Sequence, residues 1–157
     1  MHEDITTVLR QEQTGNNNGM DMSITVIEES TENDKKVTFS GAKHSLYYTQ
    51  IENSTPELKE VKGTRKAIGG YQDSQIKFTN TELLLPSKTW IYLRSDGFED
   101  QNNTVRKRFG RRALNNLLSS NTHLPAEDQK NELLNALDAH SKGVEQRDDI
   151  LLIGFQL

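Results

Sequence analysis

Two short apolar runs that meet acidic residues constrain the fold more than any other feature of the chain. Residues 90–93 are β-branched, aromatic or leucine, and they stop three residues before Asp96, where a following glycine permits a sharp turn. Residues 150–155 form a continuous apolar run directly after Asp148 and Asp149. Both runs are too short to cross a bilayer and predict strands, and the second is typical of a strand buried on both faces. Asp96 and Asp148 are therefore expected at strand ends.

A pairing of these two strands predicts a site for a hard cation. If the strands lie side by side and antiparallel, Asp96 and Asp148 come together, and two buried carboxylates repel each other unless a cation lies between them. Oxygen ligands in a chain without cysteine suit Mg²⁺ or Mn²⁺. The alternative interpretation is that Asp96 forms a turn and that Asp148 and Asp149 are a solvated strand start.

The rest of the chain predicts an α+β fold. Further strands are expected at residues 22–27, 36–40, 46–51, 58–62 and 75–79, the first two as a hairpin. Two amphipathic helices follow, with apolar stripes at Phe109, Ala113, Leu114, Leu117 and Leu118, and at Leu133, Ala136, Leu137 and His140. Strands, then two helices, then a last strand is an α+β order rather than an alternating βαβ order.

The composition indicates one globular unit with little material for a core. A chain of 157 residues predicts a single domain. Its hydrophobic fraction is 32% and rises to about 38% with the 10 glycines, against roughly 45–50% in ordinary domains. The chain is therefore either a highly soluble domain or a piece whose packing is completed by further strands.

Charge and targeting signals narrow the expected setting. A net charge of −4 argues against a protein that coats nucleic acid, and the lack of cysteine excludes a disulfide scaffold. No apolar run approaches the ~20 residues that span a bilayer, and the N-terminus lacks a signal-peptide pattern. A cytoplasmic protein without a nucleic-acid or membrane partner is expected.

A basic cluster before and within the first amphipathic helix needs a counter-charge. Cations at a helix N-terminus oppose the helix dipole by ~0.3–1 kcal/mol each. A phosphorylated substrate fits the cluster, and so does pairing with Glu99 and Asp100. The cluster comprises Arg106, Lys107, Arg108, Arg111 and Arg112.

Six short motifs follow one another along the chain, at residues 18–21, 38–44, 62–70, 95–101, 108–110 and 146–150. In this order they resemble the motifs of the PPM-type metal-dependent serine/threonine protein phosphatases, in particular their bacterial SpoIIE branch. The resemblance spans nearly the whole chain. The resemblance implies an α-β-β-α sandwich of antiparallel sheets.

The resemblance also implies a site and a reaction. Asp96 and Asp148 would be metal ligands, Asp149 a weaker or outer ligand, and Gly97 and Arg108 substrate-binding residues. Two Mg²⁺ or Mn²⁺ ions would assist hydrolysis of a phosphomonoester. The implied substrates are phosphorylated bacterial signalling proteins such as anti-sigma-factor antagonists.

The sequence departs from the family pattern at its N-terminal end. Family members carry a Gly-Asp strand end and an Asp-x-x-Gly-His-Gly loop that do not occur here, and residues 1–10 look like the end of the helix that follows them. Residues 1–157 are thus expected to be a partial, N-terminally truncated PPM/SpoIIE-type domain, its C-terminal two-thirds. The alternatives to an enzyme are a non-catalytic interaction module of the same fold, one that completes a split domain, and a gene fragment.

Overall fold

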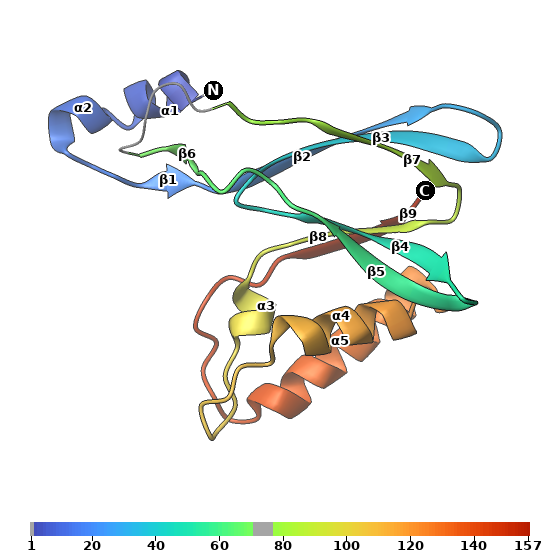
Figure 1. Cartoon of the computed structure of the whole chain (residues 1–157). Helices are drawn as coiled ribbons and strands as arrows, with labels where there is room; N and C mark the ends of the chain where they lie inside the picture. Colours follow the sequence, from blue (N-terminus) through green and yellow to red (C-terminus); the bar gives the residue numbers. More distant parts are fainter. Residues whose placement is uncertain (1, 71–76) are drawn as a thin grey trace. The chain divides into compact units, whose positions relative to one another are not determined.

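The computed structural model describes residues 2–70 and 77–157 and divides into two compact units. Unit 1 comprises Met1–Leu46 and Val61–Ser87, and unit 2 comprises Tyr47–Glu60 and Lys88–Leu157. Figure 1 shows the order of the elements along the chain. Within the described residues, no helix has the length and apolar character needed to cross a membrane.

Unit 1 is built on antiparallel strand pairs. A three-stranded sheet has the order β2 (Met22–Glu29), β3 (Asp34–Ala42) and β7 (Thr81–Pro86), and β1 (Gly19–Met20) pairs with β6 (Ile68–Gly69). Two short helices, α1 (His2–Val8) and α2 (Gln11–Thr14), precede the strands. Val37 and Phe39, which point to the same face of the central strand, are fully buried. The sheet of unit 1 therefore has a core on one face.

Unit 2 is a four-stranded sheet with helices. Its strand order is β5 (Thr55–Val61), β4 (Leu46–Glu52), β8 (Trp90–Arg94) and β9 (Leu152–Gln156), and its helices are α3 (Gly97–Asp100), α4 (Arg111–Ser120) and α5 (Ala126–Ser141). In Figure 1, α4 and α5 lie on the same side of this sheet. Leu114 and Leu118, one helical turn apart on α4, pack with Leu133 of α5 against Trp90 and Tyr92 of β8.

Most predicted elements are confirmed, with shifted ends. The β2–β3 hairpin, β4 and β8 lie where the sequence placed them, and both amphipathic helices form. β5 begins at Thr55 rather than Leu58, so it includes Pro56, which an edge strand tolerates. Ala113, expected on the buried stripe of α4, is exposed, because the face that the helix buries carries Leu114 and Leu118.

The strand predicted at 75–79 is wrong in position. Residues 75 and 76 lie outside the described part of the chain, and residues 77–80 have no regular structure. The strand here is β7, which pairs with β3 through Val37 opposite Leu83. Its three consecutive leucines do not alternate with polar residues, and they are not β-branched, so the sequence carries no period-2 signal for it.

The prediction that the last strand is buried on both faces is also wrong. β9 is an edge strand, and only one of its faces meets the helices. Ile150 and Leu152 pack against the core of unit 2, whereas Leu151 and Ile153 are exposed. The edge position leaves Leu151 and Ile153 exposed, whereas Ile91 and Tyr92, which are consecutive residues of the interior strand β8, are both buried.

Candidate active site

The expected pairing of the two strands that carry the aspartates is confirmed. β8 and β9 are antiparallel, with Arg94 opposite Leu152. The pairing continues past the strand ends, because the Ser95 main-chain N–H donates to the Leu151 oxygen at 2.9 Å. The Ser95 hydroxyl also donates to the main-chain oxygen of Asp149 at 2.9 Å and accepts from the Leu151 N–H at 3.0 Å. The turn that contains Asp96 is thus fastened to the segment that contains Asp149.

Gly97 allows this close approach. A Cβ atom at position 97 would collide with the main-chain oxygen of Asp149, and it would lie 2.9 Å from the Asp149 carbonyl carbon. Asp96 precedes α3, and its main-chain oxygen accepts from the Asp100 N–H at 2.9 Å. In the structure Gly97 is a packing residue, and its predicted role in substrate binding stays a prediction.

The three candidate ligands are exposed side chains of unit 2. Asp96, Asp148 and Asp149 are all exposed, and the Asp148 carboxylate accepts a hydrogen bond from the Asp149 N–H at 2.8 Å. Across residues 2–70 and 77–157, no group of three or more His, Cys, Asp or Glu side chains is placed to hold a metal ion. The main chains that carry the aspartates are neighbours, and ligation by these aspartates stays a prediction.

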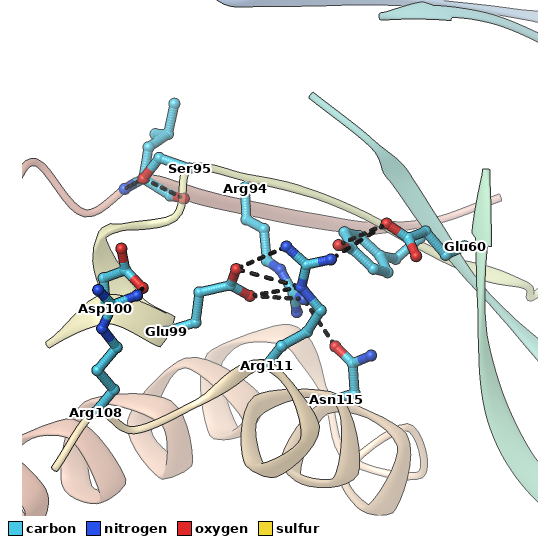
Figure 2. Close-up of polar contacts among 10 residues, drawn as sticks. Glu60, Arg94, Ser95, Glu99, Asp100, Arg108, Arg111 and Asn115 are labelled. Atoms are coloured by element: carbon cyan, nitrogen blue, oxygen red, sulfur yellow. Dashed lines mark hydrogen bonds and ion pairs between the residues drawn. The ribbon is translucent and has the colours of Figure 1, made fainter. Parts of the chain in front are cut away.

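A buried ion-pair network supports the turn from within the core. Figure 2 shows Glu99 of α3 between Arg94 of β8 and Arg111 of α4. Arg94 is 7% exposed and Glu99 8%, and their side chains lie 3.4 Å apart. Arg111 donates to Glu99 at 3.0 Å, and Arg94 donates to Asn115 at 2.8 Å. The network ties the residues that follow Asp96 to β8 and α4.

The aromatic ring of Tyr47 completes this network. The Arg94 guanidinium lies 4.0 Å from the centre of the ring, a cation–π contact, and the Tyr47 hydroxyl donates to Glu60 at 3.2 Å. Hydrogen bonding to Glu99, together with its charge, raises the pKa of Arg111. Burial raises the pKa of Tyr47, so both groups keep their protons at neutral pH.

The buried side chain of Gln101 holds the chain just before Asp148 through hydrogen bonds. Gln101, which is 2% exposed, donates to the Glu145 oxygen at 3.2 Å and accepts from the Arg147 N–H at 3.4 Å. The His140 ring nitrogen lies 3.2 Å from the Gln101 oxygen. The sequence does not predict these hydrogen bonds, because a lone glutamine after a turn has no pattern that marks it as buried.

The basic cluster finds acidic neighbours within the protein. Arg108 is 67% exposed at its side chain and pairs with Asp100 at 2.9 Å, while Arg111 pairs with Glu99. This is the pairing that the sequence allowed as the alternative to a phosphorylated ligand. Substrate binding by Arg108 therefore stays a prediction.

The combination of helices and antiparallel sheets matches the fold of PP2C-like phosphatase domains, the PPM class. The family model for Stage II sporulation protein E (SpoIIE) matches residues 3–157, and the chain belongs to this family. No curated protein matches the chain.

Three solved structures resemble the chain. The PP2C domain of SiaA from Pseudomonas aeruginosa is 30% identical over 80% of this chain and 52% of that chain, with a TM-score of 0.66. A bacterial serine phosphatase carrying a point mutation is 17% identical over 99% and 63%, with a TM-score of 0.57. The Mn-presoaked phosphatase domain of the cell fate determinant SpoIIE from Bacillus subtilis is 9% identical over 99% and 64%, with a TM-score of 0.52. The latter two support the fold alone.

The chain spans only part of each of these structures, between 52% and 64% of their lengths. The expected fold class is confirmed by the likeness.

Proposed function

We propose that the chain forms part of a serine/threonine protein phosphatase that hydrolyses phosphomonoesters in bacterial signalling proteins. The match of the SpoIIE family model to residues 3–157 carries this proposal. The fastening of the Asp96 turn to the Asp149 segment supports it, because it brings two acidic residues, 53 positions apart in the sequence, to one end of a strand pair. In the reaction, water breaks the phosphorus–oxygen bond and releases inorganic phosphate and the serine or threonine hydroxyl.

The described residues do not form a complete metal site. Carboxylates are the ligands that Mg²⁺ and Mn²⁺ prefer, so Asp96 and Asp148 have suitable chemistry, with Asp149 beside them. The part of the chain that the structure describes nevertheless holds no cluster of three or more ligands. Under this proposal Asp96 and Asp148 each supply a carboxylate ligand for the ion.

The substrate is a phosphorylated protein of the anti-sigma-factor antagonist type. The family resemblance supports this choice. Gly97 directly follows Asp96 in sequence, and the Arg108 side chain is 67% exposed while paired with Asp100. An exposed pair of this kind exchanges partners at little cost, since its interaction is worth ~0–1 kcal/mol.

A non-catalytic interaction module is the second candidate. The absence of a three-ligand cluster within the described residues favours it. In that role the chain keeps the phosphatase fold and binds a partner without hydrolysis.

Hydrolysis of p-nitrophenyl phosphate by the purified chain with Mn²⁺ tests the proposal. We expect product release that Asp96→Asn or Asp148→Asn abolishes and that Asp138→Asn, an exposed carboxylate on α5, leaves unchanged. Binding of Mn²⁺, measured from the free-ion EPR signal, should weaken in the first two variants only. A folded chain that neither binds Mn²⁺ nor releases product would refute activity of this chain alone and favour the interaction module.

A further inference from the structure

A basic cavity in unit 1 has no part in the proposed hydrolysis. Its volume is about 200 Å³. Three cations and three glycines form much of its wall: Lys43, Arg65, Lys66, Gly19, Gly69 and Gly70. These residues come from three separate stretches of the chain, so the fold gathers the cations.

A crossing of two chain segments brings the cations together. Gly41 and Gly63 lie so close that a Cβ atom at position 41 would be 3.1 Å from the Gly63 Cα, and one at position 63 would be 2.7 Å from the Gly41 oxygen. Next to this crossing, the Thr64 N–H donates to the Gly41 oxygen at 2.8 Å and the Lys43 N–H donates to the Thr64 oxygen at 2.7 Å. Lys43 and Arg65 therefore border the same cavity although 22 positions separate them in the sequence.

Lys43 adopts a left-handed backbone conformation at this point. Its φ is 58°, which a residue with a side chain adopts at a cost of order 1 kcal/mol or more. The hydrogen bond to Thr64 holds it there. The fold thus keeps a lysine at a position where glycine or asparagine is easier to place.

The part of the wall at Gly70 is held by Gln11 of α2. This side chain is 2% exposed, donates to the Asn18 oxygen at 2.6 Å and accepts from the Gly70 N–H at 2.8 Å. Gly19 pairs with Gly69, and a Cβ atom at position 19 would lie 2.5 Å from the Ala67 side chain. The glycine wall is therefore a built surface, held by a buried side chain and by strand pairing.

The charges of the cavity are not balanced by the described residues. Lys43 pairs with Asp21 at 3.4 Å, whereas Arg65 and Lys66 make no ion pair within residues 2–70 and 77–157. Three cations and one carboxylate leave a local charge of +2 in a chain whose net charge is −4. Cations held around one cavity repel each other, and a bound anion relieves this repulsion.

We propose that this cavity binds the phosphate group of a phosphorylated serine or threonine side chain. Such a group carries a charge of about −1.5 to −2 at pH 7 and three acceptor oxygens, which matches a local charge of +2. A cavity of about 200 Å³ is smaller than the ~300–1,000 Å³ that drug-sized ligands occupy, so it accommodates a phosphate and the start of a side chain rather than a nucleotide. The proposal goes beyond the proposed hydrolysis, because Asp96 and Asp148 belong to unit 2.

An NMR titration of the full chain in EDTA tests this site without metal or hydrolysis. The probes are an alanine pentapeptide with a central phosphoserine, the same peptide with serine, and inorganic phosphate. We expect the phosphopeptide to shift the backbone amides of Gly69 and Gly70. The double variant Arg65→Gln/Lys66→Gln should raise its dissociation constant at least about tenfold, since each 1.4 kcal/mol of lost interaction is a factor of ten.

Lys130→Gln/Lys142→Gln is the matched control, because it removes two exposed cations from unit 2 that lie outside the basic cluster. It should leave the amide shifts and the affinity within about twofold, the scale of a distant screened charge. Equal weakening by both double variants would overturn the site, as would equal binding of the serine peptide. Binding of inorganic phosphate without binding of the phosphopeptide would overturn the assignment to a phosphorylated side chain.

Discussion

Ser95 and Asp149 are joined by a hydrogen bond of 2.9 Å from the Ser95 hydroxyl to the main-chain oxygen of Asp149. The same hydroxyl accepts from the Leu151 N–H, so one side chain closes the gap between the end of β8 and the start of β9. The positions of the aspartates at the candidate site depend on this contact, and so do the tests of the site.

Removal of the hydroxyl should loosen the aspartate-bearing segment. Ser95→Ala loses two hydrogen bonds, and we expect the free energy of unfolding to fall by about 1–2 kcal/mol. Urea unfolding measures this change. Ser119→Ala is the control, because its hydroxyl contacts only the Asn116 oxygen of its own helix. Similar losses in both variants would contradict a special role for Ser95.

Neutralising the buried carboxylate should destabilise unit 2 strongly. Glu99→Gln leaves Arg94 buried with a weaker partner, and removing one member of a buried pair costs about 3 kcal/mol or more. The exposed pair offers the comparison: Asp100→Asn, which frees Arg108, should cost at most ~1 kcal/mol. Urea unfolding of the two variants measures these changes. A loss of unfolding free energy in Asp100→Asn as large as that in Glu99→Gln would show that burial of the ion pair does not cause the difference.

Burial of Tyr92 predicts a loss of stability in alkali. Its phenol lies in the core and donates to Gln129, and burial raises its pKa well above the ordinary 10.0. Above pH 10 the unfolded chain loses this proton while the folded chain keeps it, so the free energy of unfolding falls as pH rises, by up to ~1.4 kcal/mol per pH unit. Below pH 10 this contribution is fully present.

Tyr92→Phe should flatten that slope, measured by urea unfolding between about pH 9 and 11. A smaller slope will remain, because burial also raises the pKa of Tyr47. An unchanged slope in Tyr92→Phe would refute the assignment. The variant also loses the hydrogen bond to Gln129, so its stability near pH 8 should be lower by about 1 kcal/mol.

The two hydrogen bonds of the Gln11 side chain should stabilise the main chain at Gly70, which lines the basic cavity. Gln11→Ala leaves the Gly70 N–H and the Asn18 oxygen without this partner, at a cost of about 1–3 kcal/mol. We expect faster hydrogen exchange at the Gly70 amide. Gln13→Ala, an exposed change on the same helix, should leave that exchange rate unaltered. Equal hydrogen-exchange rates at the Gly70 amide in the two variants would show that Gln11 does not stabilise this part of the main chain.

Local sequence patterns predict an element correctly where its turn residues or its apolar period are visible within the element itself. The hairpin of residues 22–40 follows from two strand-forming runs, and the leucines of α4 follow from helical period. The pairing of β8 with β9 was expected from two apolar runs. β9 was misjudged because its position at a sheet edge depends on the strand order, which a run of apolar residues does not reveal.

The supporting residues of the candidate site were hidden for the same reason. The sequence indicates only that Arg94 is a polar residue at the end of an apolar strand. Its burial depends on Glu99 and on the Tyr47 ring, which come from other elements. The basic cluster did predict acidic neighbours, and in the structure Arg108 pairs with Asp100 and Arg111 pairs with Glu99. No local pattern pairs Lys43 with Arg65, since only the crossing of their segments brings them to one cavity.

The glycine crossing makes stability and ligand recognition inseparable in unit 1. A methyl group at position 41 or 63 would push apart two main chains, not a flexible side chain that is able to turn away. A mutational scan would therefore rank Gly41 and Gly63 among the residues needed for anion recognition, although neither touches the ligand. Changes in the cavity's specificity are therefore expected at its lining side chains, because an added Cβ atom at Gly41 or Gly63 would meet main-chain atoms.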